Sequence, residues 1–65
     1  MPVIFFYGPA LDREKAKDMI SSFTETTSRV TGIDKSKVIV CLREAPPEAS
    51  GVGGELLEDV IKRSG

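Results

Sequence analysis

Few side chains in this 65-residue sequence could do chemistry. The chain has one cysteine, Cys41, and no histidine, so a thiol nucleophile would lack its usual base and a metal its commonest ligand. Cys41 also lies within an apolar run, where a cysteine is more often part of the core than a nucleophile. We therefore expect no metal, no cofactor and no internal disulfide.

The second half of the chain offers carboxylates and glycines as further candidates. Glu44 and Glu48 could assist proton transfer or orient a cation, although carboxylates in a polar loop are usually only solvated. The glycines at 51, 53 and 54 could suggest a phosphate cradle, but the Gly-Lys-Ser/Thr ending of a P-loop is missing and two prolines precede them. A tight turn or short hairpin is the better interpretation.

Two apolar runs and a long helical pattern must position these residues. Residues 3–7 and 38–42 are apolar on both alternating faces, which is typical of strands covered on two sides. Between them, steps of three and four predict one amphipathic helix over residues 13–31. The apolar stripe of that helix consists of Ala16, Met19, Ile20, Phe23, Thr27 and Val30. A helix of this length suits a right-handed crossover, so the pattern predicts an α/β fold with two parallel strands.

Local signals set the ends of these elements. Asp12 is placed to cap the long helix at its start, and Gly32 to close it in the left-handed conformation, with Ile33 folding back onto the last turn. Apolar residues at 56, 57, 60 and 61 suit a short terminal helix. Without repeats or linkers, residues 1–65 are expected to form a single domain.

The predicted β-α-β unit has one helix to cover two apolar sheet faces. A chain of this size buries only about 60% of the surface that it exposes when unfolded. Self-association is the remaining route to a sizeable core. We therefore expect a homo-oligomer in which the uncovered face is the subunit interface.

The charge balance excludes some partners. Nine basic and ten acidic residues give a net charge of -1, which offers no general attraction to nucleic acid or to an anionic membrane. Lys35 and Lys37 are interpreted as solvated charges. No apolar run approaches the roughly 18 residues of a membrane span, and no signal-peptide pattern opens the chain. The expectation is a soluble cytoplasmic protein with neither nucleic acid nor membrane as partner.

Three features occur together: Pro2 directly after Met1, a β-α-β pattern of about this length, and Gly51-Val52-Gly53-Gly54-Glu55 beyond the second strand. In this order they resemble the 4-oxalocrotonate tautomerase family, from Pro2 to about Leu56. The resemblance implies a hexamer, and removal of the initiator methionine to free the proline nitrogen as a catalytic base. From the residues alone, Pro2 simply suits the start of an edge strand.

Two departures from the family pattern concern substrate binding. The family arginines that bind carboxylates and polarise the carbonyl align with Leu11 and Ile39, and an aromatic position aligns with Ser50. Aliphatic side chains cannot replace a bidentate arginine. Arg13 and Arg43 are the nearest substitutes, although Arg43 should lie roughly 13 Å beyond Ile39 along its strand. They could reach a substrate across a subunit boundary, or they could be solvated surface charges.

The resemblance thus implies an isomerase, specifically a tautomerase, that moves a proton within a small unsaturated keto acid. Pro2 would be the general base, and Arg13 and Arg43 would bind the substrate. A second hypothesis applies the same proline to another activated carbonyl or unsaturated acid. A third is an oligomeric binding or scaffold protein without proline chemistry. The state of Met1 separates these alternatives, because a Pro2 nitrogen acylated by Met1 is a tertiary amide and cannot act as a base.

Overall fold

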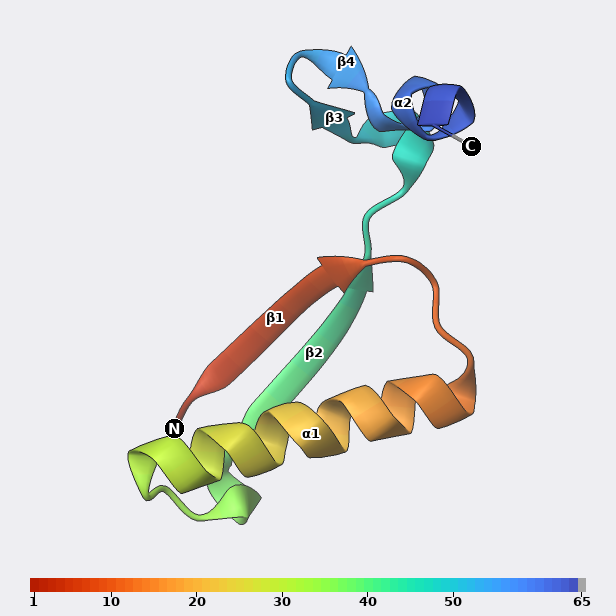
Figure 1. The fold of residues 1–65 in the computed structure, drawn as a ribbon. Helices are drawn as coiled ribbons and strands as arrows, with labels where there is room; N and C mark the ends of the chain where they lie inside the picture. The colour runs from red at the N-terminus through yellow and green to blue at the C-terminus, as the bar shows by residue number, and fades with distance from the viewer. Residues whose placement is uncertain (65) are drawn as a thin grey trace.

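A strand, a long helix and a second strand are followed by a small hairpin and a terminal helix (Figure 1). The structure is a computed structural model of the chain and describes residues 1–64. Strand β1 (Val3–Gly8), helix α1 (Arg13–Thr31) and strand β2 (Ile39–Glu44) make the β-α-β unit, and the short 3-10 helix η1 (Lys35–Lys37) leads into β2. The predicted fold class is confirmed.

The two long strands are parallel, with Val3 beside Ile39 at one end and Gly8 beside Glu44 at the other. The Ile39 N–H also donates to the Pro2 carbonyl oxygen at 3.0 Å, which ties the start of both strands together. The apolar pattern had predicted strands over 3–7 and 38–42. Strand β1 runs one residue further, to Gly8, whereas β2 begins one residue later and continues through Arg43 and Glu44, because backbone pairing does not require apolar side chains.

Helix α1 begins and ends where the sequence predicted. The Asp12 carboxylate accepts the Lys15 N–H at 2.9 Å. At the other end, Gly32 has φ 78° and donates its N–H to the Ser28 carbonyl at 2.8 Å. The Ser28 hydroxyl donates to the Ile33 carbonyl at 2.6 Å, which holds the folded-back chain against the last turn. No helix within residues 1–64 is long and apolar enough to cross a membrane.

Helix α1 packs on one face of the sheet. The rings of Phe6 and Phe23 lie 5.8 Å apart at 43°. Even so, no side chain among residues 1–64 is fully buried within the single chain. The predicted stripe is half-buried at Phe23, but Ile20 is 40% and Val30 68% exposed. Cys41, expected in the core, is also only half-buried.

The opposite sheet face is uncovered. Alternate residues of the two strands form this open face: Val3, Phe5, Tyr7, Ile39, Cys41 and Arg43. Phe5 and Tyr7 expose 56% and 66% of their surface. The radius of gyration is 15.1 Å, whereas a compact chain of this length would have about 11 Å. Residues 1–64 of the single chain therefore have no fully buried core.

Residues 46–64 form a C-terminal arm that projects from the ends of the strands (Figure 1). It contains η2 (Pro47–Ala49), the two-residue strands β3 (Gly51–Val52) and β4 (Glu55–Leu56), and α2 (Leu57–Ser64). The two glycines between β3 and β4 have φ values of 60° and 86°, which a tight two-residue hairpin requires and side chains disfavour. The expected hairpin and terminal helix are confirmed, with Leu56 in the hairpin rather than in the helix.

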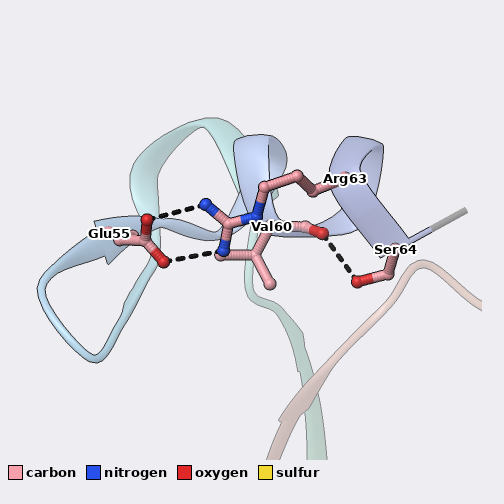
Figure 2. Close-up of polar contacts among 4 residues, drawn as sticks. All are labelled: Glu55, Val60, Arg63 and Ser64. Carbon is pink, nitrogen blue, oxygen red and sulfur yellow. Dashed lines mark hydrogen bonds and ion pairs between the residues drawn. The ribbon is translucent and has the colours of Figure 1, made fainter.

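A bidentate ion pair joins the hairpin to the helix within the arm. The two terminal guanidinium nitrogens of Arg63 donate to the two carboxylate oxygens of Glu55, at 2.7 and 2.8 Å (Figure 2). In the last turn of α2, the Ser64 hydroxyl donates to the Val60 carbonyl at 2.8 Å. The Arg63 hydrogen bonds lower the pKa of Glu55 below its ordinary value. The arm is therefore braced internally, although its side chains lie mostly in water.

Phe23→Ala should lower the free energy of unfolding by about 2 kcal/mol. That is less than the roughly 3–5 kcal/mol typical of a buried phenylalanine, because Phe23 is only half-buried in the single chain. Thr26→Ala, at an exposed position of the same helix, should change it by less than about 0.5 kcal/mol. Denaturant midpoints at one fixed protein concentration measure both. Equal small effects would mean that Phe23 does not hold α1 to the sheet.

The brace in the arm should depend on pH in a defined direction. A carboxylate whose pKa is lowered by its partner stabilises the folded arm above its unfolded pKa, and the stabilisation is lost as pH falls through the lowered value. The carboxyl carbon resonance of Glu55 should therefore titrate below its ordinary range, and Arg63→Gln should return the midpoint to that range. Lys62→Gln is the control, because Lys62 pairs with Glu58 instead. An unchanged midpoint in Arg63→Gln would contradict this account.

Candidate active site

Pro2 lies directly before β1, at the end of the sheet where both parallel strands begin. It is half-buried, and its carbonyl oxygen accepts the Ile39 N–H at 3.0 Å. Val3 and Ile39, which pair beside it, are 47% and 42% exposed and give this edge an apolar surface. Met1 is 82% exposed, so the peptide bond that must be cut to free the proline nitrogen lies at the surface. The backbone of Pro2 is thus held in place at an apolar, accessible edge.

The two arginines lie toward the other end of the strands, at the carboxyl ends of β1 and β2. Arg43 pairs with Tyr7, five residues beyond Pro2 along β1, which corresponds to roughly 17 Å. Arg13 is the first residue of α1, which follows the carboxyl end of β1. Within one chain, neither arginine is brought to Pro2. Each would have to act at the Pro2 of a neighbouring subunit.

The residues that the resemblance aligns with the family's arginine and aromatic positions have structural contacts of their own. Leu11 is half-buried in the loop before α1 and lines a shallow apolar depression with Met19 and Phe23. Ile39 begins β2 beside Pro2. The Ser50 hydroxyl donates to the Pro46 carbonyl at 2.7 Å and so helps to close the 3-10 turn of the arm. None of the three supplies a cation.

Glu44 and Glu48 line a concavity of about 550 Å³ between the strand ends and the arm. Both carboxylates are exposed, and Tyr7, Leu57 and Ile61 contribute to the same surface. Glu44 ends β2 at the edge opposite Pro2. The two carboxylates are therefore not placed to share a proton with the proline of their own chain.

The fold brings the short 3-10 helix η1, which carries Lys35 and Lys37, to the same end of the sheet as Pro2. Because α1 returns the chain to the start of the sheet, η1 lies at the same edge as Pro2 (Figure 1). Lys37 ends η1 two residues before Ile39. The sequence contained a signal for this position, since a residue just before a crossover strand must lie near the start of the first strand. The charges themselves looked like ordinary surface lysines.

Comparison with known proteins identifies the family. The model of the tautomerase enzyme family matches residues 2–60, and the chain belongs to this family of isomerase-type enzymes. The match includes Pro2 and the whole β-α-β unit. A separate comparison with curated protein sequences gave no match.

Solved structures agree with this assignment. DmpI from Archaeoglobus fulgidus is 36% identical over 89% of this chain and 100% of its own, with a TM-score of 0.83. A 4-oxalocrotonate tautomerase homologue is 28% identical over 91% and 95% of the two chains, with a TM-score of 0.78. A heterohexameric 4-oxalocrotonate tautomerase from Chloroflexus aurantiacus J-10-fl has a TM-score of 0.79 at 13% identity, covering 92% and 97%. The last match shows the shared fold alone.

Proposed function

We propose that this protein is a tautomerase in which Pro2, freed by removal of Met1, is the general base and acid for a small unsaturated keto acid. The observation that supports this most directly is the position of Pro2. The residues that the family model matches begin at Pro2, whose carbonyl oxygen accepts the first N–H of β2 and which has apolar side chains beside it.

The reaction moves one proton along a conjugated system. The proline nitrogen takes a proton from the carbon beside the carbonyl, so that a C–H bond breaks and an N–H bond forms. The electron pair of the broken C–H bond delocalises over the conjugated carbonyl system, which becomes a dienolate. The same nitrogen then returns the proton to a more distant carbon, where a new C–H bond forms. An apolar edge suits the step, because it favours the neutral amine that must accept the proton.

The substrate should carry one carboxylate rather than two. Leu11 and Ile39 offer no charge partner where the resembling family uses arginines, and an aliphatic surface cannot bind a carboxylate. Arg13 and Arg43 remain as substrate-binding candidates from a neighbouring subunit. In that position either would stabilise the developing enolate, to which a preorganised donor contributes several kcal/mol.

Such a site requires an assembly, which we expect to be a homohexamer. The open face needs an apolar cover, and a second copy offers an identical face that buries both. The heterohexameric relative supports this stoichiometry by analogy. The active site would then combine Pro2 of one subunit with cations of others.

A binding or scaffold protein with the same fold is the second candidate. The aliphatic residues Leu11 and Ile39 favour it, because they remove the donors on which the best-known family reaction depends. It differs from the enzyme in one chemical requirement. A scaffold tolerates a Pro2 nitrogen that remains acylated by Met1, whereas the base does not.

Pro2→Ala should strongly lower turnover of an enolisable monocarboxylate keto acid and shift the pH-rate profile, because the free-enzyme base sets the acidic limb. The oligomeric state should not change. Intact mass spectrometry of natively produced protein provides the control and should give a mass that lacks one methionine. Activity unaffected by Pro2→Ala, or a retained methionine, would exclude the proline base.

Arg13→Ala and Arg43→Ala test the two arginines separately. If one of them polarises the carbonyl, its loss should reduce kcat by about 10²–10³-fold, as for removal of an oxyanion donor. The corresponding dicarboxylate should be a poor substrate of the wild-type protein. Efficient dicarboxylate turnover that neither substitution affects would contradict this account of substrate binding.

A further inference from the structure

The 3-10 turn η1 is fixed in position relative to Pro2 by a continuous set of backbone hydrogen bonds. Lys37 N–H donates to the Asp34 carbonyl at 2.9 Å, and Val38 N–H to the Lys35 carbonyl at 3.1 Å. The next N–H along the chain, that of Ile39, donates to Pro2. The turn at Lys37 is therefore tied to the proline through two residues of ordered backbone.

The distance between the two residues follows from this geometry. The parallel register that pairs Val3 with Ile39 puts Pro2 opposite Val38, about 4.8 Å away, and Lys37 is the next residue of the chain, about 3.8 Å further. The Cα atom of Lys37 is therefore within roughly 9 Å of that of Pro2. By contrast, Arg43 lies near the far end of the same sheet. The fold therefore brings the backbone of Lys37, and not that of Arg43, close to the proline.

The charges around this edge leave Lys37 without a carboxylate partner. Lys35 Nζ lies 2.9 Å from the Glu25 carboxylate, so these two charges offset each other. The Asp34 carboxylate accepts the Ser36 N–H at 3.1 Å and the Ser36 hydroxyl, which lower its pKa. Lys37 is exposed, and none of the ion pairs within residues 1–64 involves it.

The packed elements add one further charge near this edge. Helix α1 contacts η1, and its last turn carries Arg29, which is exposed and forms no ion pair within the described chain. Among the described side chains at this end of the sheet, Arg29 and Lys37 are therefore unpaired cations, and the Asp34 carboxylate is held by its own turn. Only Lys37 is joined to Pro2 through the strand pairing.

We propose that Lys37 is the specificity-determining residue that binds the single carboxylate of the substrate next to Pro2. The inference rests on the proposed function and supplies the cation missing from positions 11 and 39. A lysine ammonium is a compact point charge on a flexible stem, whereas arginine presents a rigid bidentate fork. Lys37 therefore suits one carboxylate, held close to the carbon from which Pro2 takes the proton.

The same cation has a second effect on the reaction. A positive charge near an amine disfavours the protonated amine. Removing Lys37 therefore favours protonation of the base, so the acidic limb of the pH-rate profile should move to higher pH. A role in folding alone would leave that limb unchanged. The substitution Lys37→Gln removes only the Lys37 ammonium and keeps the other ionisable groups near Pro2, so a shift of the acidic limb can be assigned to that charge.

Kinetic comparison of processed wild-type protein, Lys37→Gln and Lys17→Gln tests the proposal. Lys17 is an exposed lysine of α1 without an ion pair, so it is a matched control. Two substrates are used, an unsaturated monocarboxylate keto acid and its methyl ester. Lys37→Gln should raise KM for the acid at least tenfold and change kcat/KM for the ester less than threefold. Lys17→Gln should match the wild type on both, and an equal loss on acid and ester in Lys37→Gln would overturn the proposal.

A binding measurement separates failure of this proposal from failure of the proposed function. The probe is a 2-oxo acid with no hydrogen beside its carbonyl, which cannot enolise, titrated calorimetrically. Lys37→Gln should weaken its binding at least tenfold, while Pro2→Ala should still bind it. Binding lost in Lys37→Gln without any wild-type turnover would support the lysine site and reject the catalysis. Absence of wild-type binding, or equal binding in Lys37→Gln with Pro2-dependent turnover, would reject the lysine site.

Discussion

An apolar sheet face that its own chain cannot cover is the constraint on which the rest of this structure depends. One helix covers one face, and Val3, Phe5, Tyr7 and Ile39 remain between 42% and 66% exposed on the other. Burying a large apolar side chain contributes about 1.5–3 kcal/mol. Completing the burial of these four half-exposed side chains therefore contributes roughly 3–6 kcal/mol per chain, a large part of the roughly 5–15 kcal/mol by which whole domains are stable. Folding and association of this chain should be coupled.

The candidate site follows from the same constraint. Parallel pairing of β1 and β2 places Pro2 at one edge of the sheet and Arg43 near the other. The arm extends away from the strands and contacts mainly itself, so its apolar side chains also need a partner. An assembly can bring the far edge of one subunit to the proline of another. Lys37, in contrast, lies near the Pro2 of its own chain. The proposed site would therefore combine one cation from the same chain with arginines from a neighbouring subunit.

Much of the fold could be predicted from the sequence, because its signals are local. The period of three and four, Asp12 and Gly32 gave helix α1 its ends, and the glycine pair gave the hairpin. Strand ends were less accurate, since pairing continues through Arg43, whose polarity hid it from the apolar pattern. Burial was overestimated for Val30, because a stripe shows which residues prefer an apolar partner but not whether the same chain provides it.

The candidate site was less predictable, because proximity across a crossover is a property of the whole fold. Pro2 was singled out through a family resemblance that the match over residues 2–60 confirms, while its role as base stays a prediction. The number of residues between Pro2 and Lys37 does not show that they are close, and the one signal in the sequence was the position of Lys37 just before the second strand. Arg13 was attractive for its closeness to Leu11 in sequence, yet it begins α1 after the carboxyl end of β1, whereas Pro2 of the same chain lies before the amino end of that strand.

Sedimentation equilibrium combined with far-ultraviolet circular dichroism over a dilution series tests the central claim most directly. The account predicts a homo-oligomer of six chains at micromolar concentration, with helical signal lost in step with dissociation as the protein is diluted. A monomer that keeps its helical signal and unfolds cooperatively at a midpoint independent of concentration would contradict it. That result would mean that the open face is stable in water.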